Sequence, residues 1–180
     1  MNRRRTIIVL IAAGVVAALG YSQYWVFTGR VASVEAGRLY RSAGLPAGRL
    51  LEVCRLHRIT TVVDLRKESE ETRAEAQVLA RAGIQHVSLA TGQVPSPDTV
   101  AQFLRLMDGK RHEPVLIHCT HGVGRTGVFT AIYRMEYQGW PRWRAIAEAM
   151  LFAGFGSFGP GNAKAAYLST YTPRQPGRIP

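Results

Sequence analysis

Apolar and polar positions alternate along the chain in a rhythm that predicts an α/β domain. Three short apolar runs, residues 59–65, 85–89 and 113–119, have the length and composition of buried strands. Amphipathic segments separate them. Residues 68–83 end at Gly83, and residues 96–109 begin with the helix-capping residues Ser96 and Asp98. Because helices alternate with strands, we expect a central, mostly parallel sheet flanked by helices.

The pattern continues beyond the third run. After a glycine-rich stretch, apolar residues recur at helical spacing and predict a helix that packs against the sheet: Val128, Phe129, Ile132 and Met135. Pro141 suits the first turn of a further helix. We expect the domain to cover residues 37–172 and a flexible tail to cover residues 173–180.

The N-terminal residues differ from the rest. Three arginines precede an apolar stretch, residues 6–27, whose length is close to the about 20 residues that span a bilayer as a helix. The aromatic side chains at its far end suit the membrane interface, and the arginines suit the cytoplasmic side. We therefore predict an α/β fold with an N-terminal transmembrane helix, residues 1–28, and a connector, residues 29–36.

This anchor would hold the domain outside the cytoplasm, on the periplasmic side. A cleaved signal peptide is the alternative, because Ala18 and Gly20 form the small-x-small pattern of a cleavage site. In that case the domain would be secreted.

Composition narrows the function. The net charge of +11 comes mostly from arginine. Either a basic surface faces an anionic partner, or the arginine bias has no functional meaning; no basic run other than residues 3–5 points to nucleic acid. Two cysteines are too few for a disulfide framework. Cys54 lies on a helical apolar pattern and is expected to be buried, which leaves Cys119 for chemistry.

Residues 118–127, HCTHGVGRTG, join the third predicted strand to a helix. Backbone N–H groups and the helix N-terminus converge there and form an anion site, which should lower the pKa of the Cys119 thiol and make it a nucleophile. Arg125 can bind two oxygens of a phosphate, and Thr126 can donate a hydrogen bond to the sulfur. The residues predicted to bind phosphate are Thr120, His121, Gly122, Val123, Gly124 and Arg125. For His118, a role in fixing the loop is favoured over direct catalysis.

This pattern, His-Cys-x-x-Gly-x-x-Arg-Thr-Gly, resembles the signature of cysteine-dependent tyrosine and dual-specificity phosphatases. LYRSAGLP (39–46), VVDLR (62–66) and GVFTAIYRMEYQGW (127–140) are similar to the compact bacterial members of that family. The resemblance implies a two-step reaction: Cys119 takes the phosphoryl group, and water hydrolyses the phosphocysteine, with no metal and no cofactor. It also implies that Asp64 and Arg66 form a buried pair that supports the loop.

The general acid is the point of departure from that family. Its members carry an aspartate on a loop upstream of the cysteine, but residues 87–92 contain no acid. Asp98 is the nearest candidate. An aspartate at the start of a helix also caps it, so both roles stay open.

These features predict a protein-tyrosine or dual-specificity phosphatase. Among the variable loop residues only His121 can carry charge, which favours a single phosphate on a phosphotyrosine protein over a highly phosphorylated inositol. Two alternatives stay open. A membrane anchor would bring a lipid monophosphate within reach, and the missing acid would suit a phosphate-binding module with little turnover.

Overall fold

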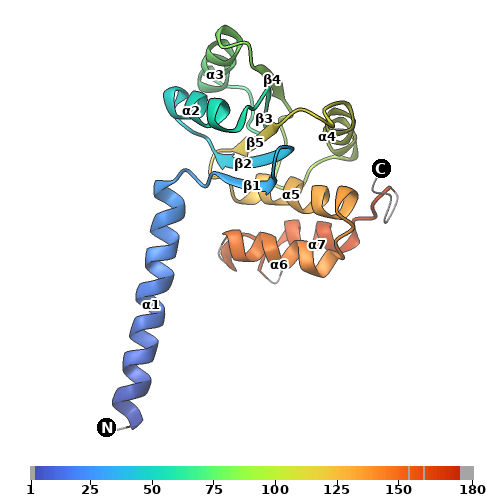
Figure 1. The fold of residues 1–180 in the computed structure, drawn as a ribbon. Coiled ribbons are helices and arrows are strands. Elements are labelled where there is room, and N and C mark those ends of the chain that lie inside the picture. The colour runs from blue at the N-terminus through green and yellow to red at the C-terminus, as the bar shows by residue number, and fades with distance from the viewer. Residues whose placement is uncertain (1–2, 154, 160, 175–180) are drawn as a thin grey trace.

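A five-stranded mixed sheet forms the centre of the structure (Figure 1). The computed structural model describes residues 3–153, 155–159 and 161–174. The strand order is β1-β2-β5-β3-β4. Only the β1–β2 pair is antiparallel within the described chain; β2–β5, β5–β3 and β3–β4 are parallel. The strands are β1 (Ala32–Glu35), β2 (Leu39–Ala43), β3 (Thr61–Asp64), β4 (Gln85–Ser88) and β5 (Val115–Cys119).

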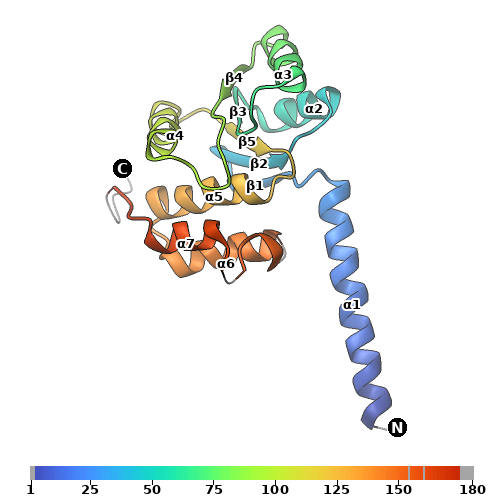
Figure 2. The same cartoon turned by 180° about the vertical axis from the view of Figure 1, so that it is seen from behind.

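Helices cover both faces of this sheet (Figures 1 and 2). One face carries α2 (Ala47–His57) and α3 (Glu70–Arg81), and the other carries α4 (Pro97–Gly109) and α5 (Gly124–Tyr137). Beneath α5 lie α6 (Arg142–Ala153), the 3-10 turn η1 (Phe155–Ser157) and α7 (Ala163–Thr170). Each face has its own apolar cluster, so the predicted α/β architecture with a mostly parallel sheet is confirmed.

Local sequence explains why these elements form. Every residue of the central strands β3 and β5 is buried, as expected for parallel strands covered on both faces. Helix α3 begins at a capping box, in which Ser69 accepts from the Thr72 N–H and Thr72 accepts from the Ser69 N–H. Helix α4 begins at Ser96, whose hydroxyl accepts from the Thr99 N–H. Both helices lie within the segments that the periodicity predicted.

The pattern of apolar positions did not identify β1 or β2. β1 lies inside the segment expected to be a connector, residues 29–36, and has one buried residue, Val34. β2 buries Arg41 and Ser42, so it lacks the apolar run by which β3 and β5 were recognised. Most of the predicted tail, from residue 175 onward, lies outside the described residues. Its second residue, Arg174, bonds Asp108 and Glu136.

The segment predicted to cross a membrane forms α1 (Arg3–Phe27), a helix that stands away from the sheet. Within residues 3–153, 155–159 and 161–174, however, no helix combines the length and the apolar character that a membrane crossing requires. The run without a polar side chain other than tyrosine, residues 7–21, is shorter than the about 20 residues needed, and Thr6 and Ser22 flank it. The predicted transmembrane anchor is wrong, and so is the prediction that such an anchor holds the domain on the periplasmic side.

The packing of the α2–α3 face can be tested by replacing leucine with alanine at a buried and at an exposed position, in two separate variants. Leu79 on α3 is 0% exposed and Leu56 on α2 is 76% exposed. Leu79→Ala should lower the free energy of unfolding by about 3 to 5 kcal/mol, since it leaves a cavity. Leu56→Ala should change it by less than about 0.5 kcal/mol. Urea unfolding followed by circular dichroism measures both; equal effects would contradict this packing.

Candidate active site

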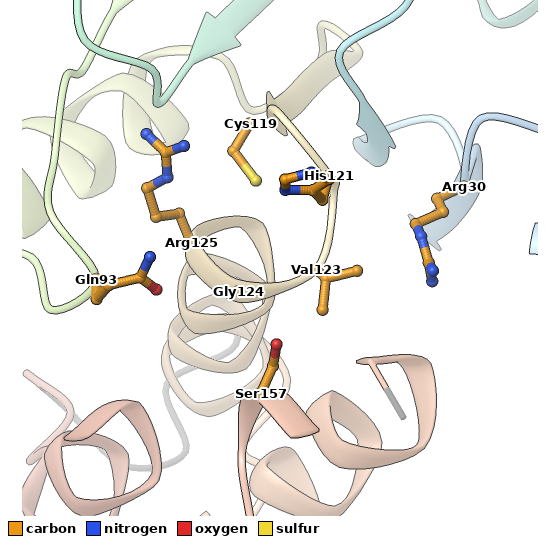
Figure 3. Close-up of a pocket in the computed structure, with 8 residues that line it drawn as sticks. All are labelled: Arg30, Gln93, Cys119, His121, Val123, Gly124, Arg125 and Ser157. Atoms are coloured by element: carbon orange, nitrogen blue, oxygen red, sulfur yellow. The ribbon is translucent and has the colours of Figure 1, made fainter. Parts of the chain in front are cut away.

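The end of the central strand β5 places Cys119, which is buried, in the lining of a pocket of about 320 Å³ (Figure 3). The loop 120–123 follows, and α5 begins at Gly124. The fold therefore brings much of the predicted phosphate loop to one place. The residues that line the pocket are Arg30, Gln93, Cys119, His121, Val123, Gly124, Arg125 and Ser157. Of these, Arg30, Gln93 and Ser157 come from other segments and were not predicted.

The loop packs closely against the end of β2. Gly122 has a φ of 66°, and a Cβ on it would lie 2.5 Å from the carbonyl oxygen of Ser42, so only glycine fits. The Gly44 N–H donates to the Thr120 carbonyl at 3.1 Å. These contacts fix the curl of the loop, whose Gly122 N–H faces the Cys119 sulfur.

Arg41 supports the same loop from beneath. Its Nη2 donates to the Gly122 carbonyl at 2.9 Å, and its guanidinium lies 3.7 Å from the centre of the Phe152 ring. Burial lowers its pKa to about 10, which still leaves it charged near neutral pH. The sequence analysis predicted no role for Arg41. The signal that could have indicated one is an arginine flanked by the apolar residues of a short segment, 39–43.

Several groups favour the thiolate form of Cys119. Burial of the sulfur opposes ionisation, but the Thr126 hydroxyl and N–H, the Gly122 N–H and the charge of Arg125 outweigh it and lower the pKa. Within the described residues the Thr126 hydroxyl has no other hydrogen-bond partner, so it is available to the sulfur. The predicted role of Thr126 is consistent with this placement.

Arg125 is oriented by the neighbouring strand. Its Nη1 donates to the carbonyl of Leu65, just after β3, at 2.9 Å, and its Nη2 donates to the Thr120 hydroxyl at 3.2 Å. In Figure 3 the guanidinium and the Cys119 sulfur border the same space. A phosphate on that sulfur would therefore meet a planar donor for two of its oxygens.

A buried ionic cluster lies behind the loop. Arg66 bonds both carboxylate oxygens of Asp64, at 2.9 and 2.8 Å, and bonds Glu75 at 2.7 Å. Glu75 Oε1 in turn lies 3.0 Å from Nε2 of His118, the residue before Cys119. The cluster thus fixes the end of β5. The sequence analysis did not predict a role for Glu75. The signal that could have revealed it is its helical spacing from Leu79, which places a carboxylate on the buried face of α3.

His86 on β4 completes the cluster, with Nε2 3.7 Å from both Asp64 Oδ2 and Glu75 Oε1. The two carboxylates raise the pKa of His86 to about 9 against the effect of burial. Burial opposes the charged form of Glu75 as well, but His118, His86 and Arg66 outweigh it and lower its pKa to about 2. Asp64, Glu75 and His86 are metal-ligand types within 4.8 Å of one another, yet Arg66 already provides a cation to both carboxylates.

The predicted general acid lies elsewhere. Asp98 is exposed in the first turn of α4, beside the Ser96 cap, and does not line the pocket. Its role as an acid stays a prediction. The residue that the β4–α4 loop does bring to the pocket is Gln93, whose Oε1 accepts from Lys164 Nζ at 3.0 Å.

A strand–loop–helix turn that holds a thiolate and an arginine at one anion site is the arrangement of a cysteine-dependent phosphatase. The family model described as DSP-PTPase phosphatase fused to NAD+ kinase matches residues 52–156. The chain therefore belongs to this phosphatase family, and the resemblance of its sequence motifs is confirmed.

Relatives agree with this assignment. The dual specificity protein phosphatase TpbA of Pseudomonas aeruginosa is 36% identical over 120 residues, which are 66% of this chain and 52% of TpbA. Its crystal structure superposes with a TM-score of 0.62 at 32% identity, covering 76% of this chain and 81% of that one. A cysteine-to-serine variant of TpbA in complex with phosphotyrosine gives a TM-score of 0.61 at 30% identity, covering 78% and 88%. The chain spans about half the length of the curated relatives it matches.

The two thiols should differ in reactivity. The loop lowers the pKa of Cys119, whereas burial and the charge of Glu75 raise the pKa of Cys54 to about 11. Iodoacetamide should therefore alkylate Cys119 near neutral pH and leave Cys54 unmodified, and inorganic phosphate should slow the reaction. Peptide mass spectrometry across pH measures this. Equal labelling of both thiols, beginning only near pH 8.5, would contradict the assignment.

The cluster around His86 predicts a loss of stability in base. Its raised pKa means that its contribution is complete below about pH 6.5, the unfolded value, and is lost as pH rises through about 9. Unfolding free energy should fall by on the order of 2 kcal/mol between pH 7 and 10 through this group. His86→Gln should flatten that dependence. His112→Gln, on an exposed residue, should leave it unchanged, and matching curves for both variants would disprove the charged cluster.

Proposed function

We propose that this protein is a phosphomonoester hydrolase of the protein-tyrosine and dual-specificity phosphatase type, acting through a phosphocysteine on Cys119. The observation that carries the proposal is the placement of the Cys119 thiol and Arg125 in one pocket at the start of α5, where the neighbouring donors lower the pKa of the thiol. A thiolate is the nucleophile that this chemistry needs, and the loop is an anion site.

The reaction follows from these placements. The loop N–H groups and Arg125 bind the phosphoryl oxygens, and the Cys119 sulfur attacks phosphorus on the side opposite the leaving oxygen. A water molecule then attacks the phosphocysteine, and the sulfur departs as a thiolate that the Thr126 hydroxyl and Arg125 stabilise. His118, Asp64, Arg66 and Glu75 hold the loop and do not touch the phosphate.

Phosphotyrosine on a protein is the proposed substrate. A TpbA variant binds phosphotyrosine, and the loop here carries one residue of variable charge, His121, which suits a single phosphate. Arg30 at the rim adds a positive charge for an anionic substrate. The lipid monophosphate alternative depended on the membrane anchor and has lost that support.

A phosphate-binding module with little turnover is the second candidate, because Asp98 lies outside the pocket. Losing a general acid typically costs about 10² to 10⁴ in rate. Turnover of a phosphotyrosine peptide separates the two functions.

Cys119→Ser should abolish phosphate release from a phosphotyrosine peptide, by on the order of 10³-fold or more, because the hydroxyl stays protonated where the thiol ionises. Binding of the peptide, measured by calorimetry, should persist. Cys54→Ala, at the other buried thiol, is the matched control and should retain turnover. Turnover retained by Cys119→Ser would rule out the proposed nucleophile, and wild-type binding without turnover would favour the binding module.

A further inference from the structure

The β4–α4 loop places an amide at the pocket where relatives are expected to place an acid. Gln93 lines the pocket together with Cys119 and Arg125 (Figure 3). Among the residues that the structure describes, no aspartate or glutamate lines this pocket. The leaving oxygen of a bound ester would therefore meet an amide and not a carboxylic acid.

Lys164 fixes the orientation of that amide. It lies in the first turn of α7 and is 7% exposed; its Nζ donates to Gln93 Oε1 at 3.0 Å and lies 5.8 Å from the centre of the Phe158 ring. A lysine ammonium can only donate, so the amide oxygen must face Lys164. Within the described part of the chain the amide NH₂ group donates no hydrogen bond, and Figure 3 shows its nitrogen on the side of Arg125.

The first residue of α5 leaves room for this pair. A Cβ on Gly124 would lie 3.3 Å from Gln93 Oε1 and 3.5 Å from Cε of Lys164. The Gln93–Lys164 pair therefore packs against the phosphate loop itself. Three segments far apart in sequence meet at this point: the β4–α4 loop, the start of α5 and the start of α7.

We propose that Gln93, held by Lys164, donates its Nε2–H to the leaving-group oxygen and replaces proton transfer by a hydrogen bond. This inference rests on the proposed phosphatase function. The Cys119 sulfur forms the bond to phosphorus, and the bond from phosphorus to the leaving oxygen breaks. Its electron pair stays on that oxygen, which departs as an oxyanion bonded to Gln93 and then takes a proton from water.

The proposal defines a substrate class. Without a general acid, an ester is cleaved at a useful rate only if its leaving oxygen is stable as an anion. The phenolate of phosphotyrosine, whose acid has a pKa of about 10, meets this condition far better than the alkoxides of serine and threonine. The site should therefore select aryl phosphates over alkyl phosphates.

The test compares kcat/KM over a series of aryl phosphates, from 4-nitrophenyl to phenyl phosphate, in the full-length protein. Gln93→Ala should lose roughly 10- to 100-fold on phenyl phosphate, where negative charge builds up on the oxygen, and little on 4-nitrophenyl phosphate. Lys164→Met should show the same selective loss. The double variant should be no worse than either single variant, because both remove one hydrogen bond.

Matched controls use exposed residues of the same types. Gln102→Ala and Lys67→Met should leave the whole series unchanged. Gln93→Glu adds a second measurement, the pH dependence of activity on phenyl phosphate, which would not change if Gln93 only packed against the loop. Its carboxylate beside Lys164 cannot donate at neutral pH, so activity on phenyl phosphate should fall there and recover as pH is lowered and the carboxyl group is protonated.

Three outcomes would overturn the inference. Gln93→Ala could lower kcat/KM equally for every substrate, which would indicate a role in phosphate binding. It could also leave kcat/KM unchanged for every substrate. Finally, Asp98→Asn could produce the selective loss instead. In each case activity through Cys119 would leave the proposed function intact. A wild-type protein inactive on the whole series would contradict the proposed function itself.

Discussion

The negative charge on the Cys119 sulfur is the feature on which the surrounding structure depends. A buried thiolate is costly, so groups on several elements must compensate it. Loop N–H groups and the start of α5 supply partial positive charge, and Arg125 supplies a full one. Each of these is held in turn. The carbonyl of Leu65, just after β3, orients Arg125, and Arg41 on β2 fixes the Gly122 carbonyl.

The arginine-rich composition is explained in part by this arrangement. Arg66 neutralises two buried carboxylates behind the loop, and Arg41 is buried beneath it. Farther away, Arg134 pairs with Glu148 and bonds the Val34 carbonyl, which ties α5 to α6 and to β1. A share of the net positive charge therefore serves internal contacts, and the excess need not describe a surface for an anionic partner.

The sequence determined the central strands, the helices around them and the phosphate loop, because each of these depends on local spacing. Residues 115–117 are apolar and every residue of β5 is buried, and the loop motif is contiguous. What it did not reveal depends on contacts between distant segments: Glu75 with His118, Arg41 with Gly122, and Gln93 with Lys164. Hydropathy was also misleading, since a run that looked long enough to cross a membrane forms no helix, among the described residues, that is long and apolar enough to do so.

Positive charge around the Cys119 thiolate also decides which kind of side chain can assist the leaving-group oxygen. A carboxyl group at position 93 would lie beside Lys164, whose charge would stabilise the ionised form and so lower its power to donate a proton. An ionised carboxylate would also repel the phosphate dianion. An amide has neither fault, because it is neutral at every pH and donates without titrating. Lys164 holds that amide and so places a further positive charge near the departing oxygen. Negative charge develops on this oxygen as its bond to phosphorus breaks.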